Sequence, residues 1–125
     1  MKKFGLLIMA MFITSTLFSC GPKNDSVDMA KTFVELLTKG DYRNAIQDFD
    51  DTMKGAMPPE KLEESWQSLL GQVGSFKKQV STKEVREQGF GVVYVTCEFE
   101  RGTINIKVVF NSEKQISGLW FVPIQ

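Results

Sequence analysis

Histidine is absent from this sequence of 125 residues, cysteine occurs only twice and proline four times. Without histidine, the chain alone cannot build a Ser-His-Asp or Cys-His mechanism, or the common histidine zinc sites. The few prolines and cysteines disfavour collagen and disulfide-rich scaffolds. An excess of one charge is also lacking, because 15 basic and 15 acidic residues balance to zero. At this length we expect one domain, with no room for a second sizeable core.

A long hydrophobic run is lacking too. The apolar segment at residues 4–18 follows two lysines and is only about fifteen residues long, whereas a membrane-spanning helix needs about 20 residues. A short run after a positive start is typical of a secretory signal. It ends in the sequence LFSCG at residues 17–21, which resembles a bacterial lipoprotein signal.

This resemblance implies that residues 1–19 are a cleaved signal peptide and that the Cys20 thiol carries a diacylglyceryl group. The new N-terminus usually receives a further acyl chain such as palmitate, and two or three chains anchor a protein stably in the bilayer. We therefore expect an exported protein that is lipid-anchored in the bacterial cell envelope, at the inner or the outer membrane. A signal anchor, or an ordinary signal peptide with a chance cysteine, is the alternative.

The mature chain would consist of the lipidated cysteine and a polar tether at residues 20–26, followed by a domain at residues 27–125. Cleavage removes two lysines and leaves 106 residues with 13 basic and 15 acidic side chains. No basic cluster exceeds the pair Lys77 and Lys78, so we expect no binding to nucleic acid. With Cys20 consumed by lipid, Cys97 has no partner for an intramolecular disulfide.

Three helical patterns come first in the domain. Apolar residues recur at helical spacing in residues 30–37, before Gly40, and again in residues 42–49, after Asp41 as a possible cap. Residues 50–55 are expected to form a loop. The third helix is expected to begin at the proline pair 58–59, to carry glutamates in its first turn and to end near Gly71 or Gly74.

Beyond Gly74 the apolar period changes from helical to alternating. We expect a polar edge strand over residues 76–86 and further strands over 93–99, 104–110 and 116–122. The short turns between them predict an antiparallel meander. Helices followed by strands predict an α+β domain, in which three N-terminal helices pack on one face of a curved four-stranded antiparallel sheet.

Several segments of the sequence are similar to a known family: GDY at residues 40–42, FD at 49–50, the helix-to-strand step at 66–76 and KQISGLW at 114–120. They resemble a small exported bacterial family of unknown function with the nuclear transport factor 2-like fold, also called cystatin-like or SnoaL-like. In such relatives the domain stands alone as a lipoprotein or is fused to an α/β-hydrolase. The resemblance covers residues 27–123, implies the fold and brings no active-site motif.

Aromatic side chains suggest one candidate site, a pocket between helices and sheet lined by Trp66, Phe76, Trp120 and Phe121, which would suit a carrier or sensor of a small apolar ligand. The alternative, which we favour, is that the same rings fill the core. Tyr94, Thr96 and Asn105 alternate with core positions, so they are candidates for an interface on the outer sheet face. Its partner would be a second copy or another envelope protein.

The sequence gives little support for a metal site, a reactive thiol or a catalytic carboxylate. The segment at 48–52 begins like a calcium loop but lacks the glycine and the glutamate that such a loop needs, and we expect neither metal nor cofactor. Cys97 is expected to be buried and structural. Glu98 and Glu100 are expected to pair with Lys107 or Lys83. A histidine-free isomerase or cyclase using a carboxylate and Tyr94 is conceivable, but the favoured function is non-catalytic binding of an unknown ligand.

Overall fold

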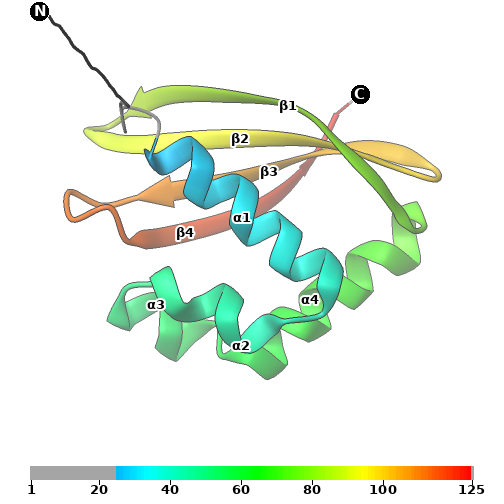
Figure 1. Ribbon diagram of the computed structural model, residues 1–125, viewed down its shortest axis with the longest axis horizontal. Coiled ribbons are helices and arrows are strands. Elements are labelled where there is room, and N and C mark those ends of the chain that lie inside the picture. The colour runs from blue at the N-terminus through cyan, green and yellow to red at the C-terminus, as the bar shows by residue number, and fades with distance from the viewer. Residues whose placement is uncertain (1–24, 125) are drawn as a thin grey trace, which may run out of the picture.

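The computed structural model describes residues 25–124 (Figure 1). The elements in chain order are α1 (Asp25–Lys39), α2 (Tyr42–Ala45), a 3-10 turn (Ile46–Asp48), α3 (Asp51–Ala56), α4 (Pro59–Val73), β1 (Phe76–Glu87), β2 (Phe90–Phe99), β3 (Gly102–Phe110) and β4 (Ile116–Pro123). The expected signal peptide, Cys20 and most of the tether lie outside these residues.

The molecule has two layers, a four-stranded sheet and a layer of helices against one of its faces (Figure 1). The strands pair in the order β1-β2-β3-β4, and every neighbouring pair is antiparallel. Both the α+β class and the meander predicted from the sequence are therefore confirmed. Four α-helices occur in the described residues where three were predicted.

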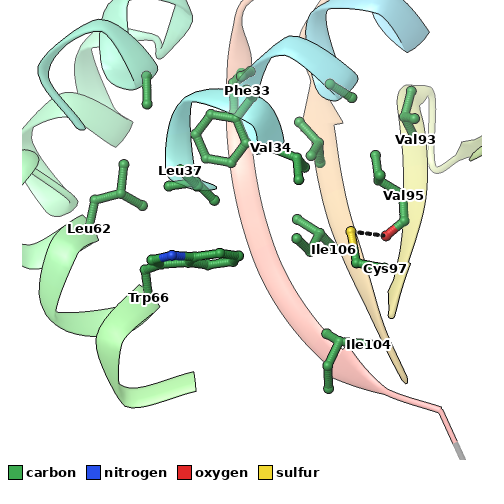
Figure 2. Packing of buried hydrophobic residues seen from close by; sticks show 14 of the residues in the cluster. Phe33, Val34, Leu37, Leu62, Trp66, Val93, Val95, Cys97, Ile104 and Ile106 are labelled. Carbon is green, nitrogen blue, oxygen red and sulfur yellow. Dashed lines mark hydrogen bonds between the residues drawn. The ribbon is translucent and has the colours of Figure 1, made fainter. Parts of the chain in front are cut away.

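The core lies between the helices and the sheet. Phe33, Val34 and Leu37 of α1 point down onto the strands, and Leu62 and Trp66 of α4 approach from the side (Figure 2). The strands contribute every second residue, as an antiparallel sheet with one covered face requires. These residues are Val93, Val95, Cys97 and Phe99 of β2 and Ile104, Ile106, Val108 and Phe110 of β3. No polar side chain of the described residues is fully buried, so burial of apolar area dominates the stability of the fold.

The predicted second helix is shorter in the structure than residues 42–49. It forms one α-helical turn and a 3-10 turn, and Phe49 is already extended. Phe49 forms an isolated parallel bridge with Ile116, and the backbone N–H of Asp50 donates to the Ile116 carbonyl at 2.9 Å. Pairing with a distant strand and burial of the Phe49 ring override the local helical pattern.

The predicted loop at residues 50–55 is also wrong, since residues 51–56 form the short helix α3. The extended Asp50 is its N-cap, and its Oδ1 accepts the backbone N–H of Met53 at 2.8 Å. An aspartate at this position satisfies one of the N–H groups that a helix start leaves unpaired. The two adjacent aspartates therefore begin a helix.

A β-bulge decides the direction of the side chains in β4. Val109 pairs with Gly118 and Phe110 with Ile116, so Ser117 is an extra residue in β4. Such an insertion reverses the alternation of the strand beyond it. Leu119 and Phe121 consequently pack against the core, whereas Trp120 points to the other face.

The step from α4 to β1 is a tight junction at Gly74. This glycine has a φ of 86°, and a Cβ placed on it would lie 2.7 Å from the Cβ of Glu100. The Glu100 carboxylate accepts the backbone N–H of Ser75 at 3.0 Å. Only glycine fits this combination of backbone conformation and close approach.

Candidate functional site

The candidate site lies on the outer face, by which we mean the sheet face turned away from the helices. No helix of residues 25–124 covers this face (Figure 1). The strand registers place the following residues on it: Ser81, Lys83, Val85 and Glu87 of β1, Phe90, Val92, Tyr94 and Thr96 of β2, Asn105, Lys107 and Val109 of β3, and Gly118, Trp120 and Val122 of β4. Four strands therefore contribute to one continuous surface.

A network of three polar side chains lies at the centre of the outer face. The Tyr94 hydroxyl donates to Glu87 Oε2 at 2.7 Å, and Lys107 Nζ lies 3.2 Å from Glu87 Oε1. The ammonium group is also 5.3 Å from the centroid of the Trp120 ring and 5.9 Å from that of Tyr94. These distances fit cation–π contacts. The network thus holds side chains from all four strands in fixed positions.

The same contacts shift the pKa values of the three groups. The hydrogen bond from Tyr94, followed by that from Lys107, lowers the pKa of Glu87. The bond to the Glu87 carboxylate raises the pKa of Tyr94 and that of Lys107. Each shift favours the protonation state that the network needs, with a charged carboxylate, a neutral phenol and a charged amine.

Two shallow hollows flank this network and share Glu87. The first, of about 550 Å³, is lined by Ser81, Lys83, Val85, Arg86, Glu87, Tyr94, Thr96 and Asn105. The second, of about 300 Å³, is lined by Glu87, Gln88, Phe90, Val92, Lys107, Val109, Ser117 and Trp120. Phe90 is 44% exposed and Trp120 is 54% exposed. Two aromatic rings accessible to a partner therefore border the second hollow.

The three residues predicted as interface candidates come together in the structure. Tyr94, Thr96 and Asn105 all line the first hollow. Thr96 Oγ1 donates to Asn105 Oδ1 at 2.6 Å across the β2–β3 pair. The hydroxyl of Tyr94 turns instead toward Glu87.

The structure separates the four residues that were predicted to line one helix–sheet pocket. Trp66 is 2% exposed, and its ring lies 6.5 Å from that of Phe76 and 6.1 Å from that of Phe121, measured between centroids. Phe99 completes the cluster at 5.8 Å from Trp66. The placement of Trp120 in this pocket is wrong, because the bulge at Ser117 moves its ring to the outer face.

A larger groove, of about 690 Å³, opens at the side of the molecule between α4 and the ends of β3 and β4. Its apolar lining comes from Leu69, Val73, Ile104, Phe121 and Pro123, and its polar rim from Glu64, Ser65, Ser68 and Gln72. Phe121 is thus the one pocket candidate that reaches both the ring cluster and an open surface.

Two further sequence expectations concern ionisable groups. Cys97 is 0% exposed, and burial raises the pKa of its thiol to about 12, as expected for a structural cysteine. Lys107 pairs with Glu87 and not with Glu98 or Glu100. Glu98 lies opposite Thr103, and Glu100 is held by the Ser75 N–H beyond the end of β2.

Sequence reasoning missed Glu87 and Trp120 as members of the outer site. Glu87 adjoins the two-residue turn Gln88–Gly89, in which both residues have a positive φ. That turn sets the β1–β2 register. The glycine at 89 is the sequence feature that indicates the turn. No sequence feature predicts the bulge at Ser117, which places the Trp120 ring on the outer face.

The described part of the chain contains neither a cluster of metal ligands nor a membrane-spanning helix. No group of three or more acidic or cysteine side chains among residues 25–124 is arranged to hold a metal ion. None of the helices in the same range is long and apolar enough to cross a membrane.

Comparison with known proteins assigns this chain to a family. The model of a family described as protein of unknown function (DUF3887) matches residues 30–119, which include most of the helices and strands described above. The chain belongs to the DUF3887 family. The match runs from α1 to Leu119 in β4, so both layers of the fold are part of the DUF3887 unit. No solved structure matches the chain.

A curated relative of this DUF3887 chain is Esterase EstD of Thermotoga maritima, which is 25% identical to it over 89 residues. The aligned segment is 71% of this chain but only 22% of the esterase. Most of the esterase therefore lies outside the similarity. An identity of this size over such a share does not establish enzymatic activity for the DUF3887 chain, either present or absent.

Proposed function

We propose that this DUF3887 chain is an exported, lipid-anchored envelope protein whose domain is non-catalytic and docks another envelope protein through the outer face of the sheet. The observation that carries the proposal is the arrangement of Phe90 and Trp120, both well exposed, around the ordered network of Glu87, Tyr94 and Lys107. The anchor in this proposal is Cys20, acylated after cleavage of residues 1–19.

The composition of the outer face supports a protein partner. Tryptophan, tyrosine and phenylalanine are enriched at protein interfaces, where a few such residues supply most of the binding energy. Here the charged groups at the centre are already paired, because Glu87 holds both Tyr94 and Lys107. A partner that covers them need not leave an unpaired charge buried, which is the main penalty for desolvating a polar surface.

The likeness to the esterase supports an accessory role. The esterase segment similar to this chain is 22% of that protein, so in the relative the DUF3887-like part is attached to a much larger body. The simplest role for a small domain attached to a large one is to make contact with it or with a third protein. We extend this to the present chain, whose contact would be with a separate polypeptide in the envelope.

Two other functions are less well supported by the geometry. The predicted carrier needs an empty space beside Trp66, but the rings of Trp66, Phe76 and Phe99 fill that space in mutual contact. An isomerase or cyclase needs a carboxylate whose pKa is raised toward neutrality. The carboxylate beside Tyr94 is Glu87, which is on the surface and has a lowered pKa.

We also propose that the domain has the nuclear transport factor 2-like fold. N-terminal helices packed on one face of a four-stranded antiparallel meander agree with it. So does the bend of β1, where two bulges between Phe76 and Ser81 shift the register against β2 (Figure 1). A bulged, twisted edge strand is what gives such a sheet its curvature.

Photo-crosslinking in living cells tests the docking surface. A benzophenone amino acid is placed at Thr96 on the outer face or, as a matched control, at Thr32 on the exposed side of α1. We expect an adduct with a second protein from position 96 and none from position 32. Tyr94→Arg, combined with the probe at 96, should abolish the adduct because it breaks the network and adds a charge.

Equal adducts from both positions, or an adduct insensitive to Tyr94→Arg, would contradict the proposed surface. An adduct with the mass of two copies of this chain would mean that the outer face binds a second copy and not another envelope protein. Circular dichroism of Tyr94→Arg checks that the variant is folded.

Metabolic labelling with a fatty-acid analogue tests the anchor separately. The wild-type chain should be labelled and should sediment with membranes, whereas Cys20→Ser should lose the label. Equal labelling of the two chains would overturn the lipoprotein assignment without affecting the docking proposal.

A further inference from the structure

The outer edge of β4 is open along most of its length. Within residues 25–124, β4 pairs with β3 on one side. On its other side the backbone of Asp50 reaches the Ile116 carbonyl at 2.9 Å, and the chain then turns away into α3. From Gly118 to Pro123, no backbone group of residues 25–124 hydrogen-bonds to this edge of the strand. An open strand edge presents unpaired N–H and C=O groups, which are a template for another strand.

The direction of the backbone groups follows from one hydrogen bond. The N–H of Ile124 donates to the Thr103 carbonyl on β3 at 3.1 Å. In an antiparallel strand, residues alternate between pointing to one neighbour and to the other. The backbone groups of Leu119 and Phe121 therefore point outward, while Pro123 has no N–H to offer. Two residues with both groups available are enough to form a short ladder.

The two edges of the sheet differ sharply in charge. The β1 edge carries Lys77, Lys78, Lys83, Glu84, Arg86 and Glu87, which is the usual protection of a strand edge against pairing. In contrast, residues 115–125 contain no charged residue. A strand that pairs with its own copy about a two-fold axis brings like residues close together, so it cannot carry charge without repulsion. Of the four strands, β4 alone meets this condition.

Exposed apolar side chains lie along the same edge. Trp120 is 54% exposed, Val122 39% and Ile124 45%. On the inner side, the groove of about 690 Å³ between β4 and α4 leaves room beside Phe121 for side chains of an added strand. Both faces of such a strand would thus meet apolar surface of this chain.

We infer that β4 is a self-association edge, at which a second copy of this chain adds its own β4 in antiparallel orientation. The two sheets then form one sheet of eight strands, with the helices of both copies on the same face. The residues covered by the second copy are Trp120, Val122 and Ile124 on one side and Phe121 on the other. This inference shares Trp120 with the docking proposal but rests on a different feature, the open backbone edge of β4, so the variants Tyr94→Arg and Val122→Lys distinguish the two.

Sedimentation equilibrium of the full chain in density-matched detergent tests the inference, because the measured mass is then that of the protein alone. The wild type is expected to be in monomer–dimer equilibrium. Val122→Lys places a charged side chain in the apolar surface that the second copy covers, once on each side of the two-fold axis, and should raise the dimer dissociation constant about tenfold or more. The matched control is Val80→Lys, at a valine that is 53% exposed on the opposite edge strand, which should leave the dissociation constant unchanged.

Amide hydrogen exchange supplies a second measurement. Exchange at Leu119 and Phe121 should slow as protein concentration rises, and the effect should disappear in Val122→Lys. A wild type that stays monomeric up to about 0.1 mM would overturn the inference. So would equal weakening by Val122→Lys and Val80→Lys. Loss of the dimer in Tyr94→Arg but not in Val122→Lys would move self-association to the outer face and likewise overturn it.

Discussion

Lys107 is the residue that joins the parts of the outer face. Its ammonium group contacts a carboxylate from β1 and lies near rings from β2 and β4. Contacts at such exposed positions are screened by solvent and contribute little to stability. Their effect is therefore to fix the positions of Tyr94 and Trp120 more than to stabilise the fold, and side chains fixed in advance lose less entropy when a partner binds.

The lowered pKa of Glu87 predicts a pH dependence. Because its pKa is lower in the folded than in the unfolded chain, Glu87 contributes stability above the unfolded value, and this contribution is lost as pH falls through the folded value. The urea midpoint of the wild type should therefore fall more steeply than that of Glu87→Gln between about pH 5 and about pH 3. Glu84→Gln on the same strand is the control and should follow the wild type. Parallel curves for wild type and Glu87→Gln would contradict the role of this carboxylate.

We expect the Cys97 thiol to be unreactive in the folded protein. Its side chain is 0% exposed, its pKa is raised to about 12 by burial, and the thiol contacts the Val95 carbonyl at 3.7 Å (Figure 2). In a Cys20→Ser background, iodoacetamide at about pH 8 should leave Cys97 unmodified in buffer and label it completely in denaturant. Mass spectrometry of the intact chain reads out the result. Rapid labelling of the native chain would mean that the β2–β3 core opens readily.

At the scale of elements, the end of α4 depends on a glycine that no other residue can replace. Gly74→Ala must accept a φ of 86° and a Cβ at 2.7 Å from Glu100, so unfolding should become easier by about 1–3 kcal/mol. Gly71→Ala is the matched control three residues earlier, where a Cβ meets nothing within 4 Å. As an alanine inside a helix, it should stabilise the chain by about 0.5–1 kcal/mol. Urea denaturation of both variants gives the comparison, and effects of the same sign would contradict this account of the junction.

The elements also show what the sequence could and could not predict. The helical and alternating patterns predicted α1, α4 and all four strands, because burial on one face leaves a regular period in the sequence. The short elements between α1 and α4 were wrong because long-range contacts decide them: Phe49 pairs with Ile116, and Asp50 caps α3. In β4 a single extra residue, Ser117, reversed the face of Trp120. The candidate site was therefore predicted only in part: Tyr94, Thr96 and Asn105 were predicted, whereas Glu87 and Trp120 were missed.

At the scale of the whole molecule, coverage of only one sheet face separates the two tryptophans. Trp66 lies in the ring cluster at 2% exposure and Trp120 on the outer face at 54%. Trp66→Ala should cost about 3–5 kcal/mol of unfolding free energy, as for other large aromatic side chains removed from cores. Trp120→Ala should cost about 1 kcal/mol or less. Similar losses in urea denaturation would mean that the outer face is as tightly packed as the core.

The path of the chain through the sheet has a mechanical consequence. The helix α1 begins near the β1–β2 hairpin, and β4 ends toward the other end of the sheet, beside Thr103 at the start of β3 (Figure 1). The first turn of α1 and the last residues of β4 therefore lie toward different ends of the sheet. In a protein attached to a surface through its N-terminus, the domain would act as a rigid spacer, with any load applied along the strands.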